Sequence, residues 1–219
     1  MAAAYTLILG NKNLSSWSLR PYLAMRATGA AFDEVLVRLD RPETRAQIRD
    51  HSPAGKVPVL KISEAGRTVT VWDSLAICET LAERHAHAKL WPDDPAVRAV
   101  ARAFAAEMHS GFPDVRDQLA MNFSRRIPTP ELRDTTRQQV ARIIEAWSGA
   151  LEHYGQGGGF LFGRFSIADC MYAPVVSRLI TYDIEVPPAI DAYCQRMMAL
   201  PAMQDWAAAA KLETEAGWK

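Results

Sequence analysis

The sequence predicts a mixed α/β domain followed by an all-helical domain. In residues 1–84, short apolar or β-branched runs alternate with segments of helical periodicity, which is the pattern of an α/β unit. In residues 96–219, apolar side chains recur every three or four positions, as helices require. Residues 85–95 break the periodicity and contain two prolines, so we place the linker between the domains there.

Composition narrows the possible functions. The 25 basic and 25 acidic side chains cancel and no basic tract is present, so nucleic acid is not an expected partner. The N-terminus lacks a signal-peptide pattern, and no apolar run has the roughly 20 residues of a membrane span, so we expect a cytoplasmic protein without membrane contact. Cys78, Cys170 and Cys194 are far apart and odd in number, which favours reduced thiols; no metal site is expected.

The first predicted strand, residues 5–9, leads through a short loop into a helix that reaches Thr28. Proline is tolerated in the first turn of a helix, so Pro21 makes Ser18 the expected N-cap. Ser15 and Ser16 then lie ahead of the helix, with their hydroxyls near its positive end. A strand over 32–39 and a short helix over 42–50 are expected next.

A hairpin and a capped helix complete the first domain. An apolar run over 59–62, a turn and a β-branched run over 68–72 predict the hairpin, and Asp73-Ser74 opens the helix as capping residues do. The order is then strand, helix, strand, helix, two strands and a helix.

Part of a ligand site is expected at the start of this hairpin. Pro58 directly precedes a strand whose apolar sequence predicts burial, where proline cannot donate to the ladder. A cis peptide bond between Val57 and Pro58 would resolve this conflict by turning the chain sharply into the strand. The backbone of Val57 would then face outward, and Ser74 at a helix N-terminus would suit a carboxylate. The pattern indicates half of a site for a small anionic peptide-like molecule, with a plain capped hairpin as the alternative.

This order of elements, with Val57-Pro58 before the third strand and Asp73-Ser74 at the last helix, resembles the thioredoxin-like domain of cytosolic glutathione S-transferases. The run SSWSLRP resembles their serine-type classes, in particular a bacterial zeta- or theta-like member, with Trp17 at the position of a zeta-class cysteine. The resemblance spans the chain. It implies a thioredoxin-like βαβαββα domain followed by an all-helical glutathione transferase domain, glutathione as co-substrate and a homodimer.

The resemblance also implies a role for the serines. Glutathione attacks as its thiolate, and a hydroxyl near a helix N-terminus stabilises the charged sulfur. Ser15 is the first choice for this role and Ser16 the second, with simple capping as the alternative for both. Four further positions would bind glutathione through its cysteinyl backbone, γ-glutamyl end and glycyl carboxylate: Val57, Asp73, Ser74 and Lys56. Lys56 could instead be a solvated lysine beside a turn.

In the helical half, the resemblance implies a second-substrate pocket against the first long helix. The candidates to line it are Met108, His109, Phe112, Arg116 and Phe123. Met108 and Phe112 follow the apolar spacing, so the protein core is their alternative, and an ordinary exposed arginine is the alternative for Arg116.

Other residues have structural expectations. Gly111 and Pro113 should kink the long helix over 97–119. Ser166 and Asp169 form a capping-box pattern, so we assign Asp169 to stability rather than chemistry. Arg20, on the first helix, is expected in a structural salt bridge, with the steering of anions as the alternative.

Together these observations predict a cytoplasmic glutathione transferase that activates the glutathione thiol for attack on a small electrophile or peroxide, as in detoxification, without a metal. One alternative is a glutathione-dependent cis-trans isomerase of the maleylacetoacetate type. Another is a non-enzymatic ligand-binding or scaffold protein of the same fold. A thiol reductase would need a reactive cysteine, and Cys78 lies on the apolar face of a predicted helix.

Overall fold

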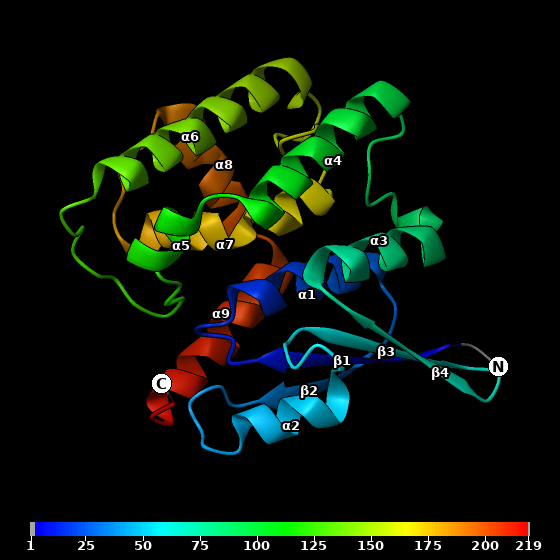
Figure 1. The fold of residues 1–219 in the computed structure, drawn as a ribbon. Coiled ribbons are helices and arrows are strands. Elements are labelled where there is room, and N and C mark those ends of the chain that lie inside the picture. Colours follow the sequence, from blue (N-terminus) through cyan, green and yellow to red (C-terminus); the bar gives the residue numbers. More distant parts are fainter. Residues whose placement is uncertain (1–2, 219) are drawn as a thin grey trace.

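The computed structural model describes residues 3–218, and its N-terminal part is a four-stranded mixed sheet (Figure 1). The strands lie in the order β2-β1-β3-β4, with bounds β1 (Ala4–Gly10), β2 (Asp33–Val37), β3 (Val59–Glu64) and β4 (Arg67–Trp72). β1 is parallel to β2 and antiparallel to β3, which pairs with β4 as the predicted hairpin. The predicted order of strands and helices is confirmed.

Helices cover both faces of this sheet. α1 (Ser16–Thr28) and α3 (Ser74–Arg84) lie on the face toward the helical part, and α2 (Thr44–His51) lies on the other (Figure 1). Successive side chains of a strand point to opposite faces. Leu7 and Leu9 therefore join the main core, whereas Ile8 packs in a small cluster with Ile48 of α2.

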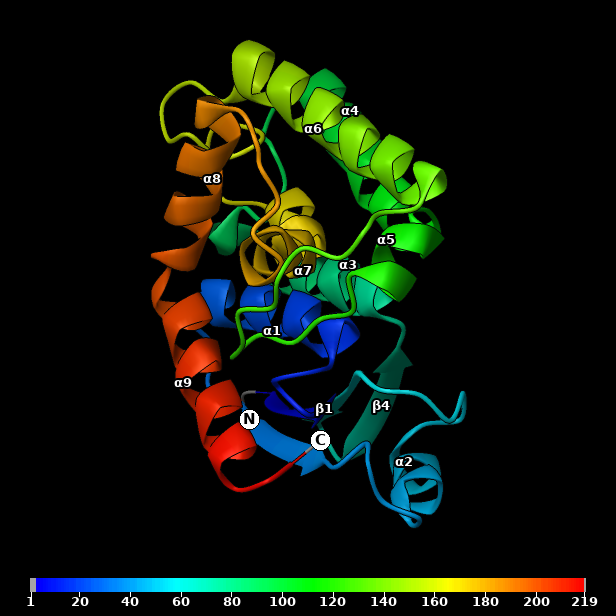
Figure 2. The same cartoon turned by 90° about the vertical axis from the view of Figure 1, so that its left-hand side faces the viewer.

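The C-terminal part is helical. Its elements are a 3-10 turn (Ala86–Ala88), α4 (Pro95–Ser110), α5 (Pro113–Gln118), α6 (Asp134–Tyr154), α7 (Ile167–Thr181), α8 (Pro188–Met198) and α9 (Pro201–Glu215). α7 is buried along almost its whole length and packs against α1 and α4, so it forms the centre of the contact between the two parts. Figure 2 shows α9 descending beside α1 toward the sheet. No helix within residues 3–218 has both the length and the hydropathy to cross a membrane.

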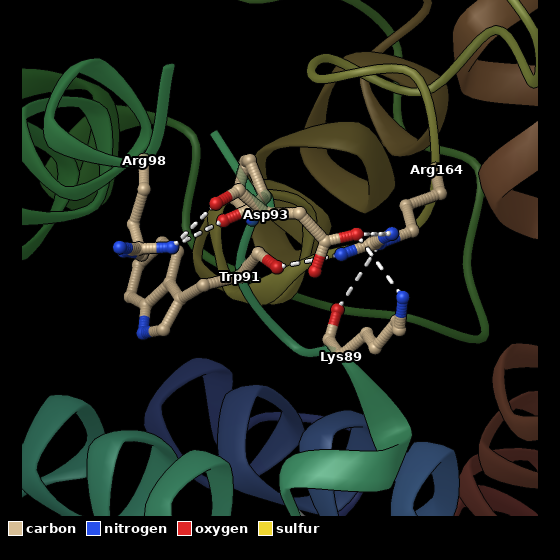
Figure 3. Close-up of polar contacts among 6 residues, drawn as sticks. Lys89, Trp91, Asp93, Arg98 and Arg164 are labelled. Carbon is tan, nitrogen blue, oxygen red and sulfur yellow. Dashed lines mark hydrogen bonds and ion pairs between the residues drawn. The ribbon is translucent and has the colours of Figure 1, made fainter. Parts of the chain in front are cut away.

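Arg164 fixes the segment between α3 and α4 (Figure 3). Its guanidinium donates to the carbonyls of Lys89 at 3.3 Å and Trp91 at 2.9 Å, and to the carboxylate of Asp93 at 2.9 Å. The hydrogen bond from Arg164, and a second one from Lys89, hold the pKa of Asp93 at about 2. α3 ends at Arg84 and α4 begins at Pro95, and the division into two domains around this segment stays a prediction.

α1 begins earlier than we expected. Ser15 is its N-cap, so the assignment of that position to Ser18 was wrong, and Pro21 lies inside the helix rather than in its first turn. The cause is the preceding turn, in which the carbonyl of Asn11 accepts from Leu14 N at 3.1 Å and from Ser15 N at 2.7 Å. This turn delivers the chain directly into the helix and brings Ser15 to its N-terminus.

The long helix expected over 97–119 is broken rather than kinked. α4 ends at Ser110 and α5 begins at Pro113, where proline fits the first turn of a new helix. Phe112 between them has φ of 60°, a left-handed conformation that no helix continues through.

The predicted capping box is present at the start of α7. Asp169 Oδ2 accepts from Ser166 N at 2.8 Å and from Ser166 Oγ at 3.0 Å. Asp169 Oδ1 accepts from Leu161 N and from the Tyr193 hydroxyl, both at 3.1 Å. The carboxylate is fully buried, and all four donors point at it, so it joins α7 to the loop before it and to α8.

Asp169→Asn tests this structural role. The amide nitrogen would face a donor, so we expect the free energy of unfolding to fall by about 1–3 kcal/mol, measured by urea denaturation at pH 7. An unchanged free energy would contradict the role.

The pH dependence gives a second test of Asp169. Burial raises its pKa from 3.8 to about 6. As pH rises, the unfolded chain releases this proton at a lower pH than the folded chain does. The raised pKa therefore contributes to the free energy of unfolding below about pH 4, and this contribution is lost as pH rises through about 6. We expect the stability of the natural protein to decline over that window relative to Asp169→Asn, measured by denaturation at each pH.

Candidate functional site

Three loops meet at one edge of the sheet. The register sets Ile8 beside Val59 and Val59 beside Trp72, so the end of β1, the start of β3 and the end of β4 share that edge. The chain leaves β1 for α1, enters β3 and leaves β4 for α3 at this edge. These segments line a cleft of about 670 Å³.

All six residues proposed to contact glutathione line this cleft. They are Ser15, Ser16, Lys56, Val57, Asp73 and Ser74. Trp17 and Trp72 also line it, and sequence reasoning gave neither a role. The spacing of the six along the chain shows nothing of their proximity, which arises from the strand register. Their roles stay predictions, but one extended molecule could reach them all.

The hydroxyl of Ser15 is oriented by a neighbouring serine. Ser15 Oγ donates to Ser18 Oγ at 2.7 Å, and Ser18 Oγ accepts from Gly10 N at 3.0 Å. Both Ser15 and Ser16 are more than nine-tenths buried, and their hydroxyls lie at the positive end of α1. The site therefore holds two hydroxyls where an anionic sulfur would be stabilised.

The C-terminal helix holds the loop that carries Ser15. The carboxylate of Glu213 on α9 accepts from Lys12 N at 2.8 Å and from Asn13 N at 3.0 Å. The indole of Trp206, also on α9, donates to the carbonyl of Lys12 at 2.7 Å. Sequence reasoning missed these contacts, because Glu213 is 200 residues from Asn13 and no local pattern connects them.

The predicted cis peptide bond is present between Val57 and Pro58. Ladder pairing of β3 begins only at Val59, so the backbone of Val57 lies outside the sheet. Within residues 3–218 neither its N–H nor its carbonyl has a hydrogen-bond partner. A peptide-like ligand could pair with both groups as an added strand does.

Asp73 and Ser74 line the cleft at the start of α3. Asp73 has φ of 74°, a region that non-glycine residues rarely adopt and that costs about 1–3 kcal/mol. Its Oδ1 caps α3 by accepting from Leu75 N at 2.9 Å, and its Oδ2 lies 3.3 Å from His109 Nε2. The Ser74 hydroxyl is buried and has no partner among the described residues. Two residues that line the cleft at the positive end of α3 thus supply a carboxylate and a buried, unsatisfied hydroxyl.

The second-substrate candidates lie outside the lining of the cleft. Met108, Phe112 and Phe123 are buried in the core, as the alternative for the first two anticipated. Arg116 is half-buried and donates to the carbonyls of Gly111 and Met108, where it caps the end of α4. Their role in a pocket stays a prediction.

Two of the polar candidates nevertheless contact residues of the cleft. The ring of His109 lies 5.4 Å from that of Trp17 and, as described, pairs with Asp73. The guanidinium of Arg116 lies 4.7 Å from the Trp17 ring centroid, and that of Arg20 lies 4.2 Å from it. The salt bridge expected for Arg20 was wrong, because no carboxylate pairs with it in residues 3–218.

The cysteines offer no reactive thiol. Cys78, Cys170 and Cys194 are free and buried, and burial raises the pKa of each above its ordinary value. A thiol reductase needs an accessible, low-pKa cysteine, so this chemistry has no support. Over residues 3–218, no group of three histidine, cysteine, aspartate or glutamate side chains could hold a metal ion.

Comparisons with known proteins find relatives for both halves. A family model described as glutathione S-transferase, N-terminal domain, matches residues 14–84, and one described as glutathione S-transferase, C-terminal domain, matches residues 130–209. A probable maleylacetoacetate isomerase of Caenorhabditis elegans is 26% identical over 174 residues, which cover 79% of this chain and 78% of that protein.

Solved structures are similar over nearly the whole chain. Maleylacetoacetate isomerase from Anaeromyxobacter dehalogenans, with bound GSH in the active site, is 25% identical with a TM-score of 0.69, covering 94% of this chain and 95% of that one. Glutathione transferase Omega 2S from Trametes versicolor is 21% identical with a TM-score of 0.73, covering 99% of each. These likenesses confirm the predicted thioredoxin-like fold followed by a helical domain.

Asp73→Asn separates two tasks of one side chain. The amide oxygen can still cap α3, so stability should change by less than about 0.5 kcal/mol. If Asp73 pairs with the ammonium of the γ-glutamyl group, glutathione binding should weaken about tenfold, because that ammonium would lose a charged partner. Isothermal titration calorimetry measures the affinity, and an unchanged value would remove Asp73 from the site.

His109→Phe is the matched control for Asp73→Asn. It keeps an aromatic ring beside Trp17 and removes the pair with Asp73. An equal loss of affinity in this variant would attribute the effect of Asp73→Asn to the lost pair instead of a ligand contact.

Proposed function

Because the chain belongs to the glutathione S-transferase family, whose two domain models match well over half of it, we propose that it binds glutathione and activates the thiol for attack on a small electrophile or peroxide. The observation that carries this proposal is the cleft itself. It combines hydroxyls at the N-terminus of α1 with the unpaired backbone of Val57 and with Asp73 and Ser74.

Each polar part of glutathione has a chemical counterpart in this cleft. The γ-glutamyl carboxylate suits the unsatisfied Ser74 hydroxyl and the α3 N-terminus, and the ammonium suits Asp73. The cysteinyl amide and carbonyl suit the free N–H and carbonyl of Val57. Lys56 is exposed at the rim, where its ammonium suits the glycyl carboxylate. In this orientation the thiol lies toward α1 and Ser15.

Energetics support Ser15 as the residue that stabilises the thiolate. A free thiol has a pKa of about 8.5, and lowering it by two units requires about 2.7 kcal/mol. A hydrogen bond to a charged group contributes about 1.5–3 kcal/mol, and a helix N-terminus about 0.3–1 kcal/mol. Ser15, as the N-cap of α1, combines both effects.

Ser18 supports Ser15 in this role. A hydroxyl can rotate to donate in another direction, so a thiolate would draw the Ser15 hydrogen toward sulfur and Ser18 would then donate to Ser15. The chain from Gly10 N through Ser18 and Ser15 to the sulfur would polarise each bond in turn.

Paired alanine variants of the two serines test the mechanism. In Ser15→Ala we expect the pKa of the bound glutathione thiol to rise by at least about one unit, and in Ser16→Ala by less than about half a unit. The ultraviolet absorbance of the thiolate, followed against pH, measures both. The reverse result would transfer the role to Ser16. If the natural protein bound no glutathione, the enzyme proposal would fail in favour of a non-enzymatic role.

Cis-trans isomerisation is the second candidate, because the relatives at 25–26% identity are maleylacetoacetate isomerases. In that chemistry the thiolate adds to a conjugated cis double bond, rotation follows, and elimination restores glutathione. The two candidates differ in whether glutathione is consumed. Turnover of a cis-configured conjugated keto acid at constant glutathione concentration would favour the isomerase, and stoichiometric loss of glutathione with an aryl halide would favour the transferase.

A cytoplasmic homodimer is the assembly that we propose. The edge strand β4 exposes Val69 by 57% and Trp72 by 46%, which a second copy could cover. Sedimentation equilibrium decides between the chain mass of 24.3 kDa and twice that value.

A further inference from the structure

Arg20 is a buried cation that stacks on the ring of Trp17 but has no counterion or hydrogen-bond partner among the described residues. Its side chain is 0% exposed, and none of its three guanidinium nitrogens has a hydrogen-bond partner among residues 3–218. Buried charges in proteins are normally paired, because an unpaired one loses its hydration without compensation. The face of the Trp17 ring compensates part of this cost, but no carboxylate pairs with Arg20 among the described residues.

Two neighbouring arginines add positive charge near Arg20. Arg116 on α5 and Arg178 on α7 are close enough to act on it, and neither forms an ion pair among the described residues. Burial, and then these two cations, lower the pKa of Arg20 to about 9. Negative charge on Cys78 or Asp73 would raise the pKa of Arg20. Burial raises the pKa of the Cys78 thiol, however, so this thiol stays uncharged. Asp73, which lines the cleft, is therefore the anion among the groups that act on Arg20.

The guanidinium lies behind the wall of the cleft. Arg20 follows Ser16 by four residues on the same face of α1, and long side chains on a helix point back toward its N-terminus. The guanidinium carbon lies 4.2 Å from the ring centroid of Trp17, a side chain that lines the cleft together with Ser15 and Ser16. The unpaired charge thus lies beside the first turn of α1, where the hydroxyls are.

We propose that the positive charge of Arg20 stabilises the thiolate of bound glutathione from behind Trp17, as an electrostatic partner that does not touch the ligand. This inference rests on the proposed function. Opposite charges about 10 Å apart, at an effective dielectric constant of about 20, change a pKa by about one unit. Ser15 and the α1 N-terminus supply the direct contacts, and Arg20 adds to them at longer range.

Arg20→Met is the informative variant, because methionine has similar length and no charge. We expect the pKa of the bound glutathione thiol to rise by about one unit. Affinity for S-methylglutathione, which has no ionisable thiol, should stay within about twofold. The melting temperature should not fall, since an apolar side chain replaces an unpaired buried cation.

Two further variants serve as matched controls. Arg20→Lys keeps the charge, so its thiol pKa should stay closer to the natural value than that of Arg20→Met. Arg178→Met removes a buried arginine that donates from Nε to the carbonyl of Leu119 at 2.8 Å. This variant should lose stability, because that carbonyl is left without its partner, and should change the thiol pKa less than Arg20→Met does.

The outcomes separate this inference from the proposed function. If the thiol of bound glutathione has the same pKa in Arg20→Met as in the natural protein, the electrostatic role is overturned. A parallel loss of S-methylglutathione binding and of melting temperature also overturns it, because it indicates a packing role. Failure of the natural protein to bind glutathione at all would instead remove the proposed function.

Discussion

The site depends on a carboxylate at the far end of the chain. Glu213 accepts from the partly buried amide of Lys12 and from the buried amide of Asn13, which would otherwise lack partners. The carbonyl of Asn11 in the same loop accepts the amide of Ser15, so fixing the loop also fixes the N-cap of α1. α9 therefore sets the geometry of the cleft, although none of its described residues lines it.

Two helix N-termini converge on one volume because of the strand order. β1 and β4 both end, and β3 begins, at the same edge, so α1 and α3 start side by side above it. Each N-terminus carries partial positive charge and follows a polar N-cap residue, Ser15 or Asp73; of the two side chains, that of Asp73 accepts a capping hydrogen bond. A ligand with a thiolate at one point and a carboxylate at another fits two such ends better than a single one.

Local patterns in the sequence predicted the features that depend on neighbouring residues. The hairpin, the cis bond before Pro58 and the Ser166–Asp169 capping box all depend on turn and cap chemistry within a few positions. The start of α1 was predicted wrongly, because three serines can each cap a helix and the turn at Asn11 decides among them. The contact of Glu213 with the loop could not be predicted, since it depends on how α9 packs.

The strongest argument for function is the gathering of unfavourable features around one cleft. Asp73 adopts a rare backbone conformation, the Ser74 hydroxyl is buried without a partner, and Arg20 is buried without a counterion. Each lowers stability, and a sequence selected for folding alone would have simpler solutions at all three positions. Under the proposed function, the ligand carboxylate would offset the cost at Ser74, its thiolate would offset the cost at Arg20, and its ammonium would pair with Asp73. Fold similarity alone would leave these residues unexplained.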